Sequence, residues 1–382
     1  MPSSVSPQVK LLRKMVELYS PTGQENEIAQ LLKGEMRSFG LESRIDEAGN
    51  TIGEYAGGDS TILLCGHMDT VPGRIPVRMN GKKLYGRGAV DAKSALAAMI
   101  SAASLLTVED FPGRLIVVGA VDEEGKGRGV RSLIEKGIRA DYAVFGEPSG
   151  AENITIAYKG SCRLKLTCRT KTGHSSAPWL FRNAVDETLS FWRRIQRIHF
   201  PEEKTESRFH SVTSALTEIH GGGPSSTVPS FCELHADFRL PPVVPSKRLL
   251  EAVSQAAEAY RLSRSNLELK VEVEDLCEPY EADRESVLVR GLAWAIRNVK
   301  GRPATLLRKT GTGDMNLLGN ALHIPIVSYG PGNSKLDHTD DERIDFDEYL
   351  DSIKILQKGL VRTLELHDKA VRKHSVSVGA GH

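Results

Sequence analysis

The sequence Leu63-Leu64-Cys65-Gly66-His67-Met68-Asp69-Thr70 joins an apolar run to two polar side chains. The apolar and β-branched residues 61–65 predict a buried strand. The strand breaks at Gly66 and is followed by His67 and Asp69, which share one face because side chains alternate along an extended chain. An Asp so placed can hydrogen-bond the imidazole and fix which ring nitrogen is free to bind a metal. A single His-x-Asp pattern is weak evidence for a metal site, and the motifs that follow it in the chain strengthen this interpretation.

Composition limits the classes of protein that fit. A chain of 382 residues is long for one core, so we expect two domains. The hydrophobic fraction of 40% and the charged fraction of 26% are typical of globular proteins, and a net charge of +1 favours neither nucleic acid nor an anionic membrane as a partner. No apolar run approaches membrane-spanning length, and residues 1–19 lack the apolar core of a signal peptide. Five scattered cysteines indicate reduced thiols, and together these features favour a cytoplasmic protein.

Acidic residues follow several predicted strands in the first half of the chain. The buried strand predicted over 114–120 precedes Asp122-Glu123-Glu124-Gly125, and the strand predicted over 142–145 precedes Glu147. Strands alternate with helices here, which predicts an α/β fold with a mainly parallel sheet flanked by helices. In such sheets ligands bind beyond the carboxyl ends of the strands. We therefore expect these polar side chains to converge: His67, Asp91, Glu123, Glu124 and Glu147.

From about Lys159 the pattern changes to strands that alternate polar and apolar residues. The elements follow the order β-α-β-β-α-β of a ferredoxin-like unit. We expect residues 159–275 to form this inserted α+β domain, with an exposed sheet edge or helix face as a dimer contact. Residues 1–158 and 276–382 would form the first domain, which a helix over 346–366 closes.

Two histidines and several carboxylates on one rim suit a pair of borderline divalent metals such as Zn²⁺. One carboxylate would bridge two cations about 3.5–4 Å apart, and each cation would take one His and one further carboxylate. The open positions would hold a shared water whose pKa falls towards roughly 7. Adjacent Glu123 and Glu124 cannot both point the same way from an extended chain, so one should bind metal and the other act as a general base.

Six motifs, in this order, resemble the successive motifs of the dinuclear zinc aminoacylase/carboxypeptidase family (peptidase family M20). They are His67-Met68-Asp69, Gly88-Ala89-Val90-Asp91-Ala92-Lys93, Asp122-Glu123-Glu124-Gly125, Gly146-Glu147-Pro148-Ser149, Gly173-His174-Ser175 and Asp337-His338-Thr339. The family includes acetylornithine deacetylase, succinyl-diaminopimelate desuccinylase and glutamate carboxypeptidase. The resemblance covers nearly the whole chain and implies a zinc-peptidase-like catalytic domain interrupted by a dimerisation or lid domain.

The resemblance also implies a role for each motif. The metal ligands would be His67 and Glu147 on one zinc, Glu124 and His338 on the other, and Asp91 between them. Asp69 would orient His67, while Glu123 would deprotonate the bridging water and pass the proton to the leaving amine. His174 resembles the lid residue that reaches into the partner subunit's site of a homodimer and stabilises the oxyanion. Co²⁺ is a possible substitute for Zn²⁺, and the family tends to hold the peptide bond after the bridging Asp in cis.

Within the family, three stretches resemble the branch that releases lysine or ornithine from an amino-group carrier protein, in lysine or arginine biosynthesis. They are Tyr85-Gly86-Arg87-Gly88-Ala89-Val90-Asp91, Ala157-Tyr158-Lys159-Gly160 and Thr312-Gly313-Asp314-Met315-Asn316. There the amino acid is joined through its α-amino group to the γ-carboxyl of the carrier's terminal glutamate. Arg239 resembles a family arginine near the substrate carboxylate, where a bidentate pair would suit, and Thr312 is a second expected substrate contact. The lid stretch Ser225-Ser226-Thr227-Val228-Pro229 lacks the Asn that is common before Val-x-Pro.

Two alternatives stay open. One is another hydrolase of the family, either an N-acyl-diamino acid deacylase or a small-peptide carboxypeptidase. The other is a binding protein that keeps the fold without catalysis, although no ligand or base of the motifs is missing. If Lys126, Arg128 and Lys159 steer an acidic carrier, binding should weaken as salt is added.

Overall fold

The computed structural model describes residues 6–55, 57–106 and 111–379, with side chains described as far as residue 371. It divides into two compact units. Unit 1 comprises Met1–Ala157, Ala282–Arg308 and Gly313–His382, and unit 2 comprises Tyr158–Glu281 and Lys309–Thr312. Unit 2 is thus an insertion in the sequence of unit 1.

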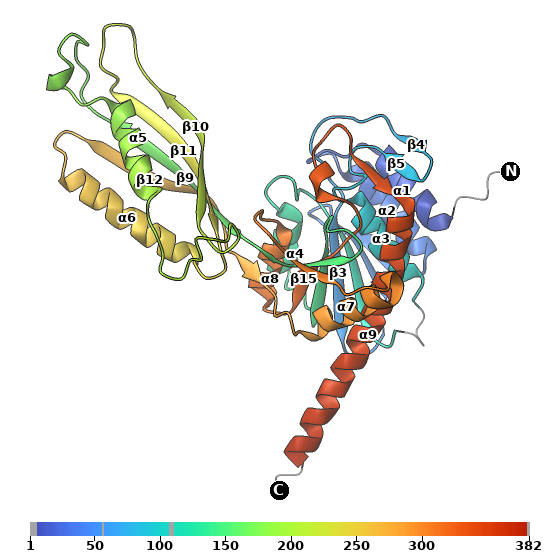
Figure 1. The fold of residues 1–382 in the computed structure, drawn as a ribbon. Coiled ribbons are helices and arrows are strands. Elements are labelled where there is room, and N and C mark those ends of the chain that lie inside the picture. The colour runs from blue at the N-terminus through green and yellow to red at the C-terminus, as the bar shows by residue number, and fades with distance from the viewer. Residues whose placement is uncertain (1–5, 56, 107–110, 380–382) are drawn as a thin grey trace. The chain divides into compact units, whose positions relative to one another are not determined.

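Unit 1 is built on a twisted sheet whose centre is parallel (Figure 1). In spatial order the strands that unit 1 contributes to this sheet are β1 (Glu42–Ile45), β2 (Thr51–Tyr55), β6 (Arg114–Ala120), β3 (Thr61–His67), β7 (Tyr142–Gly146), β15 (Ile326–Ser328) and β8 (Asn153–Tyr158), and β14 (Thr305–Lys309) also pairs with β8. Strands β6, β3, β7 and β15 run parallel, whereas β1, β2 and β8 pair antiparallel at the flanks. The predicted mainly parallel sheet is confirmed.

Helices lie on both faces of this sheet (Figure 1). They are α1 (Pro7–Glu17), α2 (Asn26–Ser38), α3 (Lys93–Ser104), α4 (Arg128–Glu135), α7 (Val287–Lys300), α8 (Asp314–Leu322) and α9 (Phe346–Gly379). Helix α3 is rich in small residues and almost wholly buried, so it packs tightly on the central strands. A Cβ built at Gly66 would lie 3.3 Å from the Cβ of Leu96, which explains why glycine interrupts the apolar run of β3.

The closing helix α9 continues to Gly379, well beyond the predicted end at Leu366. The prediction was wrong because it followed the buried apolar stripe, whose last buried member is Leu364. Polar residues such as Asp368 and Lys369 extend the helix without packing against the sheet. A hydrophobic stripe therefore marks where a helix is buried, and not where it ends.

A small antiparallel sheet lies at the rim of unit 1. Its order is β16-β5-β4, from β4 (Arg78–Asn80), β5 (Lys83–Tyr85) and β16 (Arg343–Asp345). The one-turn helix η2 (Ser334–Leu336) precedes His338. This sheet pairs the segment before Asp91 with the segment after His338, since Arg343 is opposite Tyr85.

Unit 2 is a four-stranded antiparallel sheet with two helices. In chain order its main elements are β9 (Gly160–Arg169), α5 (Ala184–Ile195), β10 (Thr213–Gly221), β11 (Phe231–Leu240), α6 (Ser246–Leu262) and β12 (Glu268–Cys277), with η1 (Pro178–Leu180) before α5 and β13 (Tyr280–Glu281) after β12. The spatial order is β10-β11-β9-β12. The predicted β-α-β-β-α-β order is confirmed. Residues of β11 alternate between buried and partly buried, and the edge strand β10 is exposed along most of its length.

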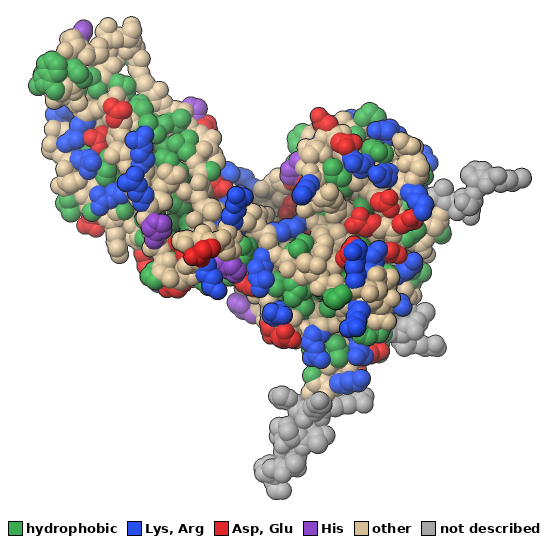
Figure 2. All heavy atoms as spheres, viewed as in Figure 1, with side chains coloured by type: hydrophobic (Ala, Val, Ile, Leu, Met, Phe, Trp, Pro, Cys, Tyr) green, Lys and Arg blue, Asp and Glu red, His purple; other side chains and the backbone are tan. Residues whose placement is uncertain are grey.

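The described surface mixes charges of both signs. Figure 2 shows Lys and Arg side chains interspersed with Asp and Glu, as expected for a net charge of +1. All five cysteines are free thiols, in agreement with the prediction. Among the described residues, no helix combines the length and the apolar character needed to cross a membrane.

Candidate metal centre and active site

His67 ends the central strand β3 and is wholly buried. Its Nδ1 lies 3.0 Å from the carbonyl oxygen of Asp69 and 3.4 Å from the carboxylate Oδ1 of the same residue. A proton on Nδ1 would be donated to that carbonyl, which leaves the Nε2 lone pair free. Nε2 lies 3.2 Å from Asp91 Oδ1 and 3.8 Å from Glu147 Oε1. The ring therefore turns its free nitrogen towards two carboxylates.

Asp91 presents one carboxylate oxygen to each of two imidazoles. Its Oδ1 is 3.2 Å from His67 Nε2, and its Oδ2 is 3.0 Å from His338 Nε2. Burial by itself raises the pKa of Asp91, but hydrogen bonds from His338 and His67 outweigh it and hold this pKa below its ordinary value. The Asp91–Ala92 peptide bond is cis. A carboxylate that faces two nitrogen ligands from opposite oxygens has the arrangement of a bridge between two cations.

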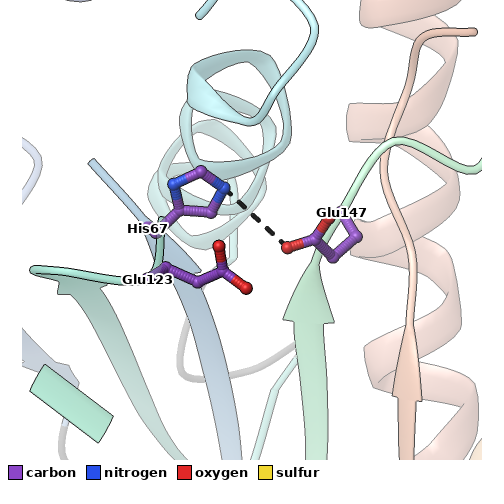
Figure 3. Close-up of side chains that lie close together, drawn as sticks. All are labelled: His67, Glu123 and Glu147. Atoms are coloured by element: carbon purple, nitrogen blue, oxygen red, sulfur yellow. Dashed lines mark ion pairs between the residues drawn. The ribbon is translucent and has the colours of Figure 1, made fainter. Parts of the chain in front are cut away.

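His338 lies in the segment between η2 and β16, and its imidazole contacts both Asp91 and Glu124. Its Nε2 is 3.0 Å from Glu124 Oε1, and the hydrogen bond to Asp91 is the largest cause that raises the pKa of His338 to about 9. The possible ligand atoms form two groups. One group comes from His67, Glu123 and Glu147, and the other from Asp91, Glu124 and His338. Within each group the ligand atoms all lie within 4.8 Å of one another. Figure 3 shows the first group, with the three side chains pointing towards a common space beyond the strand ends.

The donor set fits two divalent cations. Four carboxylates and two imidazoles meet at one rim of the sheet, so the negative charge exceeds what the imidazoles can balance. Mixed nitrogen and oxygen ligands are those that Zn²⁺ and similar metals take in catalytic sites. The two groups, with Asp91 facing both, provide the separate ligands and the shared ligand that a two-metal centre requires.

The acid pair after β6 is fixed by Asp69. The carboxylate of Asp69 accepts the backbone N–H of Glu123 and of Glu124, each at 3.1 Å, and the hydroxyl of Thr22 at 2.8 Å. The two glutamate side chains then diverge into different ligand groups. Burial raises the pKa of Glu123 to about 7, well above its ordinary value. A carboxyl group with such a pKa can both accept and return a proton near neutral pH.

Three expected site residues belong to unit 2. His174 is exposed, and its Nδ1 accepts the backbone N–H of Ser176 at 3.1 Å. Arg239 and Thr312 are brought together, because Nη1 of the guanidinium donates to the Thr312 hydroxyl at 2.9 Å. Arg239 Nε donates to Asp237 Oδ2 at 2.8 Å. Two nitrogens of the guanidinium are thus held by protein groups.

The expectation that Lys159 steers an acidic partner is wrong. Its side chain is fully buried, and Nζ donates to three oxygens in residues 208–213: the carbonyls of Arg208 and Ser211 and the hydroxyl of Thr213. Burial lowers the pKa of Lys159 to about 8. The sequence around a strand junction does not reveal that a distant loop covers it. Lys126 and Arg128, in contrast, are exposed.

The structure also contains a buried ion pair that the sequence did not reveal. Arg87 Nη1 lies 3.0 Å from Glu342 Oε2, and the side chains are 7% and 1% exposed. In the sequence, Glu342 ends the acidic run Asp340-Asp341-Glu342, which is typical of a solvated turn. The only available signal was its place two residues before the apolar position Ile344 of a short strand.

The chain matches a family model and is similar to known proteins over most of its length. A model of peptidase family M20/M25/M40 matches residues 63–362. A protein of Pyrococcus furiosus, provisionally named a LysW-lysine/LysW-ornithine hydrolase, is 36% identical over 94% of this chain and 98% of its own. The LysW-lysine hydrolase of Deinococcus radiodurans is 33% identical over 92% of this chain and 96% of its own. The Bacillus subtilis YxeP protein, described as a dinuclear metal-binding peptidase, shares the fold with a TM-score of 0.74 at 13% identity, over 94% of this chain and 98% of its own.

Proposed function

Because the chain belongs to peptidase family M20/M25/M40, we propose that it is a two-zinc amide hydrolase acting on an amino-group carrier protein. It would release lysine or ornithine from the γ-carboxyl of the carrier's terminal glutamate, in cytoplasmic lysine or arginine biosynthesis. The carrier specificity rests on the names of the relatives, which cover nearly the whole chain. The proposal of hydrolytic chemistry rests on one observation: one oxygen of the Asp91 carboxylate faces His67 and the other faces His338.

The two groups support the proposed ligand roles. His67 and Glu147 would hold one zinc, Glu124 and His338 the other, and Asp91 both, with Co²⁺ as a possible substitute. Two divalent cations bound there would polarise the scissile carbonyl and acidify the attacking water. Asp69 would keep His67 in the tautomer with Nε2 free, mainly through its carbonyl oxygen.

Glu123 is the proposed general base. It follows β6, directs its carboxylate into the space shared with His67 and Glu147 (Figure 3), and has a pKa raised towards neutrality. It would take a proton from the attacking water and pass it to the nitrogen of the scissile amide, which leaves as the α-amino group of lysine or ornithine. Glu124, the next residue, lies instead within 3.0 Å of His338 and is the proposed ligand.

Three residues of unit 2 have proposed roles of their own. Arg239 would bind the α-carboxylate of the lysine or ornithine moiety, with Thr312 holding the guanidinium in place. His174 would stabilise the oxyanion in the site of the partner subunit. Residues 159–275 would then act as the dimerisation and lid domain, and residues 1–158 and 276–382 as the catalytic domain. The exposed edge strand β10, with Leu216 and Ile219 37% and 41% exposed, supports a homodimer contact.

A substrate comparison tests this function. The purified chain, loaded with Zn²⁺, is assayed on carrier protein bearing γ-linked lysine or ornithine, and beside it on N-acetylornithine, succinyl-diaminopimelate and small peptides. We expect kcat/KM to be highest for the carrier conjugates. If a free acyl amino acid or a peptide is cleaved as well as the conjugate, the deacylase or carboxypeptidase alternative replaces the carrier assignment. If the zinc-loaded chain binds the conjugate but releases no amino acid, it is a binding protein of the same fold.

A further inference from the structure

We propose that Glu342, oriented by Arg87, is a positioning residue that holds the segments of Asp91 and His338 at the separation needed for two cations. This inference rests on the proposed two-metal function and extends it to residues that contact no metal. Every contact that carries it lies within unit 1.

The carboxylate of Glu342 binds the backbone on one side of the Asp91 ligand. Its Oε1 accepts the N–H of Val90 at 2.9 Å and the N–H of Asp91 at 3.0 Å. Its Oε2 faces the Arg87 guanidinium at 3.0 Å. Both oxygens are therefore engaged, and the charge is balanced in the buried position. The main chain that carries the proposed bridging carboxylate cannot rotate without breaking two of these bonds.

Arg87 ties the same group to the segment that carries His338. The Nη1 that faces Glu342 also donates to the carbonyl of Thr339 at 3.1 Å, and Nε donates to the carbonyl of Gly73 at 3.0 Å. Thr339 directly follows His338 in the chain. The Arg87 guanidinium thus contacts Thr339, which is next to His338, and also contacts the Glu342 carboxylate that binds the backbone of Asp91.

Backbone pairing reinforces the link. The backbone N–H of Gly86 donates to the carbonyl of Glu342 at 3.2 Å. Strand β16, which starts at Arg343, pairs antiparallel with β5, which ends at Tyr85. The Asp91 segment and the His338 segment are therefore joined directly beside the two ligands, although 247 positions separate the ligands themselves (338 − 91).

This arrangement has a specific consequence for metal binding. Asp91, Glu124 and His338 offer ligand atoms to one cation, which needs all three side chains in fixed positions. A network that fixes the ligand backbones lowers the cost of bringing them together when the cation binds. Loss of such outer contacts in metal sites typically weakens metal affinity roughly 10–100-fold.

The test measures Zn²⁺ affinity of the metal-free full chain by calorimetry with a competing chelator. The variants are Glu342→Ala, which removes the carboxylate, and Glu342→Gln, which keeps an oxygen for the two amides but removes the charge facing Arg87. We expect Glu342→Ala to lose roughly 10–100-fold in affinity for at least one of two zinc equivalents, and Glu342→Gln to lose less. If the alanine variant does not fold, the glutamine variant decides the case.

A matched control separates positioning from general destabilisation. Asp141 Oδ2 accepts the backbone N–H of Thr61 at 2.7 Å, at the end of β3 opposite to His67. Asp141→Ala removes a carboxylate-to-backbone hydrogen bond from the same unit and is expected to lower the Tm of the metal-free protein without changing either zinc affinity. The visible absorption of the Co²⁺-loaded proteins gives a second readout, expected to change for Glu342→Ala and not for Asp141→Ala.

Two results would overturn the inference alone. Parental zinc affinity in both Glu342 variants would show that the contacts do not position the ligands. An equal loss of affinity in Asp141→Ala would show that any destabilisation of unit 1 has the same effect. A parent chain that binds no zinc at all would instead overturn the proposed metal centre, and this inference with it.

Discussion

The carboxylate of Asp69 accepts the backbone N–H of Glu123 at 3.1 Å, and this contact couples the two halves of the site. The same carboxylate accepts the N–H of Glu124, while the Asp69 carbonyl lies 3.0 Å from His67 Nδ1. Asp69 therefore orients the imidazole of His67 through its main chain and the acid pair through its side chain. The proposed ligand His67 and the proposed base Glu123 are thus positioned by the same residue.

Glu123→Gln should separate catalysis from metal binding. Glutamine has nearly the same shape but cannot accept the proton of the attacking water, so we expect kcat to fall roughly 10²–10⁴-fold. Zinc content, measured by elemental analysis after removal of free metal, should remain at two ions per chain. Loss of zinc in parallel with activity would exchange the roles proposed for Glu123 and Glu124.

His338→Ala should reduce zinc occupancy, because the variant removes the only nitrogen in the group formed with Asp91 and Glu124. We expect occupancy to fall from two ions towards one, with activity lost in proportion. His220→Ala is the matched control, since His220 is an exposed histidine in unit 2 whose contact is with Glu218. An unchanged zinc stoichiometry in His338→Ala would remove this residue from the site.

Much of the fold could be predicted because hydrophobic periodicity reflects the layers directly. Buried strands such as β3 and β6 are continuous apolar runs, and the strands of unit 2 alternate as one-sided strands do. The convergence of His67, Asp91 and the acid pair also followed from sequence, because parallel strands present their carboxyl ends at one edge. A prediction of this kind needs only the position of a residue along its strand.

The contacts that hold the site residues in place could not be predicted, because they do not depend on the position of a residue along its strand. Glu342 and Arg87 meet across a gap of 255 positions, and Glu342 shares its acidic run with the exposed Asp340 and Asp341. Lys159 was assigned to the surface, although a loop about 50 positions away covers it, from Arg208 to Thr213. Side chains that satisfy buried backbone groups depend on tertiary contacts, and such contacts leave no periodic pattern in the sequence.

The stability of the metal-free protein should depend on pH through Glu123. Its pKa is raised to about 7 by burial, so the neutral form is favoured in the folded state. The stabilisation is complete below the unfolded pKa of about 4.3 and is lost as pH rises through about 7. Glu123→Gln lacks this loss, so its Tm relative to the parent should increase between about pH 5 and pH 8.

Thermal denaturation in the presence of a chelator measures this difference. Comparing parent and variant at each pH cancels the titration of groups that both proteins share. Glu17→Gln is the control for the substitution itself, because Glu17 is an exposed residue on α1 whose contact is with Arg13. A constant Tm difference for Glu123→Gln over the same range would mean that the pKa of Glu123 is not raised.

Exposed basic residues beside the acid pair should accelerate the encounter with an acidic carrier. Lys126 and Arg128 follow Glu124 closely in the chain and are exposed. For the double variant Lys126→Glu/Arg128→Glu we expect kcat/KM on the carrier conjugate to fall roughly tenfold or more at low salt. The parent value should decrease as salt is added, because exposed charges are screened, whereas the variant should respond less.

The control for this prediction changes the charge equally elsewhere. Arg290→Glu/Arg297→Glu alters two exposed arginines on α7 and should leave kcat/KM and its salt dependence near those of the parent. A free γ-glutamyl-lysine substrate provides a second comparison, because it lacks the acidic surface of the carrier and should be cleaved at similar rates by the parent and both double variants. A flat salt response of the parent on the carrier conjugate, or an equal loss of activity in both double variants, would show that Lys126 and Arg128 do not guide the carrier. Substrate selection would then depend on contacts at the cleaved bond.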